Sequence, residues 1–192
     1  MQDRQQNRIS LRLASYDYAR TGLYFITICV HERQNLFGDI SDGRMKLNEA
    51  GQMIEENWAA LAHRFPNLGV DTFVVMPNHL HGIIHQNNTG SERDGEAQAQ
   101  SSPLQEGYTH PKGTGAATVG RVIQAFKSVT TFQYTQRVKN SGWMAFNGKI
   151  WQRNYHDHII CDGEALEAIR NYIIDNPTRW AEDEENPASG GG

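Results

Sequence analysis

Two histidines, His79 and His81, lie one residue apart in the apolar stretch VVMPNHLHGIIH (74–85). A strand places alternate side chains on the same face, so both imidazoles would point to one side while Leu80 points to the other. Such a pair could bind a metal ion, or it could be a hydrogen-bonded pair in a core. Catalytic metal sites generally use three protein ligands and leave positions open for substrate, so a metal site here requires a third ligand.

A second candidate group lies near the C-terminus, in the stretch RNYIIDNP (170–177). Tyr172 and Asn176 are four residues apart, so they share one face of a helix. Together they would present a phenol, which can act as a nucleophile, and an amide oxygen, which can bind a cation. The helix pattern alone favours a simpler interpretation, in which Tyr172 is an amphipathic edge residue and Asn176 ends the helix before Pro177.

The rest of the pattern predicts the elements that would position these residues. Runs rich in β-branched and aromatic residues predict strands at 23–30, 70–77 and 79–86, and a loop leading into a short strand at 149–161. Apolar residues at helical spacing predict helices at 47–65, 118–138 and 163–177. This order fits an α+β fold, with an antiparallel sheet of the ferredoxin-like or RRM-like kind and helices on one face. The histidine pair would then lie on a central strand.

The length of 192 residues suits one domain. We expect an N-terminal arm at 1–22, a single domain at 23–181 with a polar mobile insertion at 87–117, and a flexible acidic and glycine-rich tail at 182–192. No segment approaches the roughly 20 apolar residues that cross a bilayer, and the N-terminus lacks the apolar core of a secretory signal. These features predict a cytoplasmic protein that does not enter a membrane.

The net charge of −4 argues against a protein that coats nucleic acid by bulk electrostatics, but the charge is distributed unevenly. The segment 118–153 holds six basic residues, Arg121 and Lys127 among them, and no acidic one. From Asp157 onward nine acidic residues face two arginines, a balance of 2 − 9 = −7. The basic segment could be a phosphate-binding face or simply a solvated helix.

Three motifs carry a resemblance to a known family. VVMPNHLHGII resembles the HUH motif, His-apolar-His, of single-strand DNA endonucleases. Followed by WQRNYHDHII and YIIDNP in that order, it resembles the single-tyrosine transposase family, and most of all its REP-associated branch. The resemblance spans roughly residues 8–181 apart from the polar insertion, and the three motifs in order are more specific than any one alone.

The resemblance implies an activity and a set of roles. His79 and His81 would bind a divalent metal, Mg²⁺ or Mn²⁺, and Asn176 would be the third ligand. Tyr172 would attack the scissile phosphate and form a 5′-phosphotyrosine, so that DNA strands are cleaved and rejoined without ATP. The substrate would be single-stranded DNA with a hairpin-forming repeat, and the enzyme would be a monomer or a homodimer.

Four basic residues are candidates for DNA contacts. Lys127 matches a basic helix residue of the family and would contact phosphate, and Arg121 lies in the same basic helix. Arg8 and Arg12 in the N-terminal arm are candidates for a groove or flanking-base contact. Tyr155, in RNYHDH (153–158), competes with Tyr172 as the nucleophile, but similar family members have an aromatic residue there without a catalytic role.

Two other functions stay open. A replication or relaxation initiator of the wider HUH superfamily would share the His-apolar-His strand, although a Tyr-x-x-x-Asn-Pro helix at the C-terminal end is typical of the transposases. A non-catalytic nucleic-acid-binding module on an RRM-like sheet would need exposed stacking aromatics on its central strands, where this sequence has histidines.

Overall fold

The computed structural model describes residues 21–87 and 118–189. Arg8, Arg12 and all of the expected insertion except Asn87 lie outside the described residues. The described elements, in chain order, are β1 (Gly22–Cys29), η1 (His31–Arg33), β2 (Gly38–Ser41), β3 (Arg44–Leu47), α1 (Glu49–Ala59), α2 (Leu61–Arg64), β4 (Leu68–Val75), β5 (His79–Gln86), α3 (Val119–Ser141), β6 (His156–Ile160), α4 (Gly163–Asp175) and η2 (Asn176–Glu182).

Four strands form an antiparallel sheet in the order β4-β5-β1-β6. β5, which carries the two histidines, lies between β4 and β1, so the predicted position of the histidine pair on a central strand is confirmed. α1 and α2 connect β1 to β4, with β5 between these two strands, and α3 connects β5 to β6, with β1 between them. These two split βαβ units give the ferredoxin-like α+β fold that the element order predicted.

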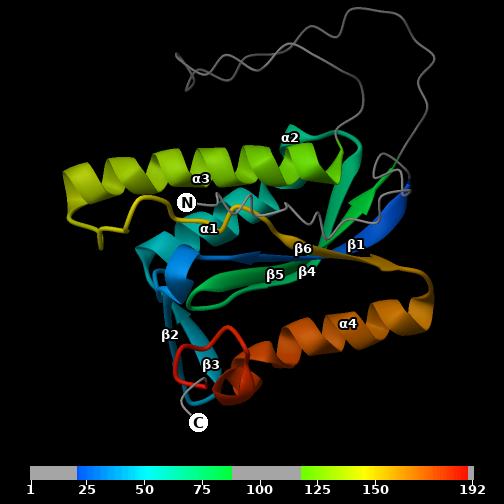
Figure 1. The fold of residues 1–192 in the computed structure, drawn as a ribbon. Coiled ribbons are helices and arrows are strands. Elements are labelled where there is room, and N and C mark those ends of the chain that lie inside the picture. The colour runs from blue at the N-terminus through cyan, green and yellow to red at the C-terminus, as the bar shows by residue number, and fades with distance from the viewer. Residues whose placement is uncertain (1–20, 88–117, 190–192) are drawn as a thin grey trace, which may run out of the picture.

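The helices cover both faces of the sheet, and the prediction that they lie on one face is wrong (Figure 1). α1 and α3 pack on one face, where Tyr24, Ile26 and Ile28 of β1 join the larger core. α4 packs on the other face, over a smaller core that includes Ile83 and Ile173. The physical reason is that β1 is apolar on both faces, so each face must be shielded from water.

The boundaries of the helices are set by local sequence. Asn48, Thr118 and Asp162 are the N-caps of α1, α3 and α4, and each side chain accepts a hydrogen bond from the backbone N–H three residues later. α3 ends at Gly142, whose φ of 68° is in the left-handed region that favours glycine. α4 is shorter than the predicted helix 163–177, because the chain tightens into the 3-10 helix η2 from Asn176 onward.

The sequence prediction missed the short hairpin formed by β2 and β3. Each strand has four residues in which polar and apolar side chains are mixed, so no apolar run indicates a strand there. The hairpin packs beside η2, close to the C-terminal end of α4 (Figure 1). None of the helices in the described part of the chain is long and apolar enough to cross a bilayer.

Gly82 allows α1 to pack directly on the strand that carries the histidines. A Cβ at Gly82 would lie 2.6 Å from Cζ2 of Trp58, which is fully buried. We therefore expect Gly82→Ala to lower the free energy of unfolding by about 1–3 kcal/mol, measured by urea denaturation. Gly163→Ala is the matched control, because a Cβ there meets nothing within 4 Å. Equal stability of the two variants would contradict the close packing.

Candidate functional site

His79 and His81 lie side by side on the face of β5 that α4 covers. Their Nε2 atoms are 3.1 Å apart, and both side chains are almost fully buried. Burial lowers the pKa of both imidazoles to about 3, and for His81 the neighbouring His79 lowers it further while Asp183 opposes the shift. Both rings are therefore neutral at physiological pH, which is the form of imidazole that binds a metal ion.

Asn78, in the turn before β5, decides which nitrogen of His79 carries the proton. Its Nδ2 donates to the backbone oxygens of Arg33 (3.0 Å) and Glu185 (2.7 Å). Its Oδ1 can only accept, and it lies 2.9 Å from Nδ1 of His79. His79 is therefore protonated at Nδ1, and the lone pair on its Nε2 faces His81.

The tautomer of His81 depends on Thr27, which lies directly opposite it on β1 with Oγ1 2.8 Å from Nδ1 of His81. If the hydroxyl donates, Nε2–H of His81 can donate to His79, which makes a pair without a metal. If it accepts, both Nε2 atoms have free lone pairs that a shared cation would bind. Ligand atoms at right angles and about 2.1 Å from an ion lie about 3 Å apart, so the observed separation suits this arrangement.

Asp183, which follows η2, brings a third ligand atom to the two histidines. Its Oδ2 lies 3.8 Å from Nε2 of His79, too far for a hydrogen bond, and the three ligand atoms all lie within 4.8 Å of one another. The backbone N–H of Glu185 donates to its Oδ1 at 2.7 Å, which orients the carboxylate. Two imidazoles and a carboxylate are a donor set that can hold a divalent metal.

Sequence reasoning missed Asp183 because it lies in the acidic run that predicted a flexible tail at 182–192. Asp183 and Glu185 are half-buried and Asn186 is buried, whereas the other residues of 182–189 are exposed and 190–192 lie outside the described residues. Asn186 is buried and donates to the backbone oxygen of Trp180, and Glu185 pairs with Arg33 at 3.1 Å. One signal was available in the sequence: Trp180 is an apolar residue just before the acidic run, and its ring centre lies 6.0 Å from that of His79.

Tyr172 lies beside the histidines on α4. Its ring centre is 5.4 Å from that of His81 and 5.9 Å from that of Phe25. The side chain is 41% exposed, so the phenol borders both the histidines and solvent. Burial and then the Asp183 carboxylate raise the pKa of the Tyr172 phenol, while a hydrogen bond with Asn176 opposes the shift. The phenol is therefore protonated at neutral pH.

Asn176, at the start of η2, is buried, and its Oδ1 has no hydrogen-bond partner among the residues that the structure describes. A buried amide oxygen without a partner costs free energy, and a bound cation would satisfy it. This observation fits the expected role of Asn176 as a metal ligand. The role stays a prediction, and Asp183 is an alternative third ligand.

Tyr155, the competing nucleophile, lies on the other side of the sheet. It packs against the core that α1 and α3 cover, and Nζ of Lys127 lies 5.8 Å from its ring centre. The fold thus brings Tyr172, and not Tyr155, next to the histidines.

The comparisons with known proteins place the chain in a family. No family model matches the chain. An uncharacterised protein of Haemophilus influenzae is 37% identical over 183 residues, which cover 93% of this chain and 92% of that protein. The chain belongs to the same family as this protein.

Two solved structures are also similar to this chain. One is a REP-associated tyrosine transposase bound to a REP hairpin, 19% identical with a TM-score of 0.48, covering 82% of this chain and 67% of that one. The other is a candidate transposase from Deinococcus radiodurans, 14% identical with a TM-score of 0.43, covering 86% of this chain and 96% of that one. Because both TM-scores are below 0.5, the function proposed below depends on the motifs and the site.

The two described basic candidates lie on α3, away from the histidines. Nζ of Lys127 donates to the backbone oxygens of Gln152 and Asn154, both at 2.8 Å, and burial lowers the pKa of Lys127 to about 8. Arg121 is exposed on the first turn of α3. Phosphate contacts by these two residues stay predictions, as do those of Arg8 and Arg12.

A salt bridge holds α4 on the sheet two residues before Tyr172. Arg170 donates through Nε to Oδ1 of Asp71 at 3.0 Å and through Nη2 to Oδ2, at a bulge in β4. Hydrogen bonding from Arg170 lowers the pKa of Asp71 from 3.8 to about 2. Because the pKa is lower in the folded state, this contribution to stability is complete above pH 3.8 and is lost as the pH falls through about 2.

Removing the charge of Asp71 tests this anchor of α4. We expect Asp71→Asn to lower the free energy of unfolding at neutral pH by up to about 1 kcal/mol, with the difference from wild type shrinking as the pH falls below 3.8. Urea denaturation at a series of pH values measures it. Glu167→Gln is the control, because Glu167 also pairs with Arg170 but is 65% exposed. Equal losses in both variants at neutral pH would show that Asp71 is not the principal partner.

Proposed function

We propose that the protein is a metal-dependent single-strand DNA endonuclease and strand transferase, a transposase of the single-tyrosine HUH class. The placement of Tyr172 beside the buried pair His79 and His81 is the observation that supports this function most strongly. Two of the three sequence motifs that resemble this class, VVMPNHLHGII and YIIDNP, contribute residues to this site, and the third includes β6, which pairs with β1. The proposal therefore has support from the motifs and from the geometry.

The residues around the histidines suit a divalent metal ion. When bound, Mg²⁺ or Mn²⁺ would neutralise charge on the non-bridging oxygens of the scissile phosphate. His79 and His81 would hold the ion through their Nε2 atoms, with Asp183, Asn176 or both completing the ligand set. Asn78 accepts from Nδ1 of His79, and Thr27 would accept from Nδ1 of His81, so that both rings keep this orientation.

Tyr172 would supply the nucleophile. Its Oη attacks the phosphorus in line with the leaving 3′-oxygen, and the bond from phosphorus to that oxygen breaks as the bond to Oη forms. The phenolic proton is balanced by the proton that the departing 3′-hydroxyl carries. The 5′-phosphotyrosine conserves the energy of the phosphodiester bond, so a second 3′-hydroxyl can reverse the step and join a new strand. The raised pKa of Tyr172 keeps the phenol protonated at neutral pH in the free protein.

The substrate would be single-stranded DNA that carries a hairpin-forming repeat. Tyr172 and the two histidines belong to one chain, and α4 packs on the sheet of that same chain. A single chain therefore holds the nucleophile together with its candidate metal ligands, and a monomer would suffice for the cleavage step.

A non-catalytic RRM-like module is a weaker candidate. Such modules stack bases on aromatic side chains of an open sheet face. In the described part of this chain, helices cover both faces of the sheet. The sheet therefore offers no open platform for bases.

Covalent capture tests the proposal. Labelled single-stranded DNA from the flanks of the gene is incubated with the wild type in Mn²⁺, Mg²⁺ or EDTA, and the products are separated on a denaturing gel. We expect a protein-DNA adduct that forms only with a divalent metal. Hairpin binding without an adduct in any metal would show that the protein binds DNA without cleaving it.

A further inference from the structure

A hollow lined by basic residues lies between α3 and the segment 149–153. Lys127, Lys149 and Arg153 line it, together with the hydroxyl-bearing residues Ser128 and Thr131, around a cavity of about 340 Å³. No acidic side chain is among the described residues that line it. We refer to this cavity as the basic hollow.

The three cations of the basic hollow have different environments. The ammonium group of Lys127 already donates hydrogen bonds within the protein, to two backbone oxygens of the segment that follows Trp151. These bonds hold that segment against α3. Lys149 and Arg153 are exposed, and neither forms a salt bridge with another residue of the described chain. Two cations are therefore available to a ligand, and the third supports the wall that carries them.

The basic hollow lies on the face of the sheet that α3 covers, opposite the face to which His79 and His81 point, but its wall lies beside the end of β1 that pairs with the histidine strand. Trp151, in its wall, forms a bridge with Val30, and the adjacent Cys29 pairs with His79. Neighbouring strands lie about 4.8 Å apart, and two such spacings separate the backbone of Trp151 from that of His79, a distance of about 10 Å. Because the histidine side chains point to the opposite face, a DNA strand that reaches both places would pass around this end of the sheet.

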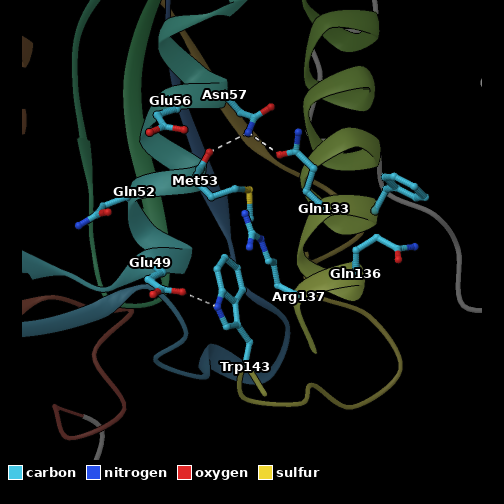
Figure 2. A pocket seen from close by; sticks show the side chains of 10 residues that line it. Glu49, Gln52, Met53, Glu56, Asn57, Gln133, Gln136, Arg137 and Trp143 are labelled. Atoms are coloured by element: carbon cyan, nitrogen blue, oxygen red, sulfur yellow. Dashed lines mark hydrogen bonds between the residues drawn. The ribbon is translucent and has the colours of Figure 1, made fainter. Parts of the chain in front are cut away.

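The other side of α3 has the opposite character. Figure 2 shows the residues that line a cavity of about 550 Å³ between α1 and α3, Glu49 and Glu56 of α1 among them. The guanidinium of Arg137 lies 6.0 Å from the ring centre of Trp143, whose Nε1 donates to Glu49 at 2.9 Å. A polyanion is therefore attracted to the basic hollow and repelled by the carboxylates of the cleft.

We propose that the basic hollow binds the sugar-phosphate backbone of the DNA substrate on the face of the sheet opposite the scissile phosphate. Lys149 and Arg153 make the contacts, and Lys127 positions the segment that carries them. The inference rests on the function proposed above, since it assigns a second contact to the same substrate. Such contacts are electrostatic and independent of base sequence, so they depend strongly on salt.

The double variant Lys149→Gln/Arg153→Gln tests the proposal. Its affinity for a fluorescein-labelled hairpin with single-stranded flanks, taken from the DNA beside the gene, is measured by anisotropy over a series of salt concentrations. We expect the slope of log K against log salt to become shallower by about 1.4–1.8, since each lost phosphate contact removes about 0.7–0.9. Arg137→Gln is the matched control: it removes one positive charge on the other side of α3, and we expect the wild-type slope.

Each outcome of this experiment has a clear meaning. A wild-type slope in the double variant, with the covalent adduct still formed, overturns the basic hollow and leaves the proposed function in place. An equal change of slope per charge in Arg137→Gln also overturns it, because the effect would then follow total charge and not position. If the wild type neither binds the hairpin nor forms an adduct, both proposals fall. Thermal unfolding of each variant confirms that the measured chains are folded.

Discussion

Replacing Tyr172 by phenylalanine should abolish the covalent protein-DNA adduct, with a loss of at least about a thousandfold in its rate of formation. The change removes the Oη that would bond to phosphorus. It keeps the ring that lies against His81 and Phe25, so the packing of α4 should be unchanged. Densitometry of the labelled adduct over time, with Mn²⁺ in excess, measures the rate.

Tyr155→Phe is the control for this prediction. It removes the same atom from a tyrosine that packs on the opposite side of the sheet, so adduct formation should continue at close to the wild-type rate. Hairpin affinity, measured separately by anisotropy, should be retained in both variants. The assignment of the nucleophile is wrong if Tyr172→Phe still forms the adduct, or if Tyr155→Phe loses it.

Replacing Asp183 by asparagine should weaken Mn²⁺ binding by more than about tenfold. The Asp183 carboxylate is the acidic ligand that lies with the two Nε2 atoms in the cluster of potential metal ligands found among the described residues. Without its charge, the two neutral imidazoles hold a divalent ion less tightly. Titration calorimetry with Mn²⁺ in the absence of DNA measures the effect independently of activity.

Glu182→Gln is the matched control for Asp183→Asn. It removes a carboxylate from the neighbouring residue, whose side chain is 78% exposed, and should leave Mn²⁺ affinity unchanged. His81→Ala should abolish measurable binding. Asn176→Ala distinguishes the two candidate third ligands: a loss in Asn176→Ala with full affinity in Asp183→Asn would assign the position to Asn176 and exclude Asp183.

The sequence by itself determined the features that depend on residues near one another in the chain. The spacing of His79 and His81 put them on one face of β5, because the side chains of a strand repeat every two residues. The helical spacing of apolar residues predicted a helix at 163–177, and three of these residues, Leu166, Ile169 and Ile173, form the side of α4 that packs in the smaller core. The order of strands and helices then restricted the fold to the split βαβ kind.

Only the tertiary structure decided which distant residues meet at the site. Tyr172 and Tyr155 both lie near candidate chemistry in the sequence, and their separation onto opposite faces follows from how α4 and β6 are placed. Asp183 reaches His79 because η2 turns the chain back toward β5, although its acidic neighbours read as a solvated tail. The spacing of apolar residues in a helix or strand predicts which face of that helix or strand a residue lies on. Which other helix or strand packs against that face depends on contacts between distant parts of the chain, and local patterns do not determine these contacts.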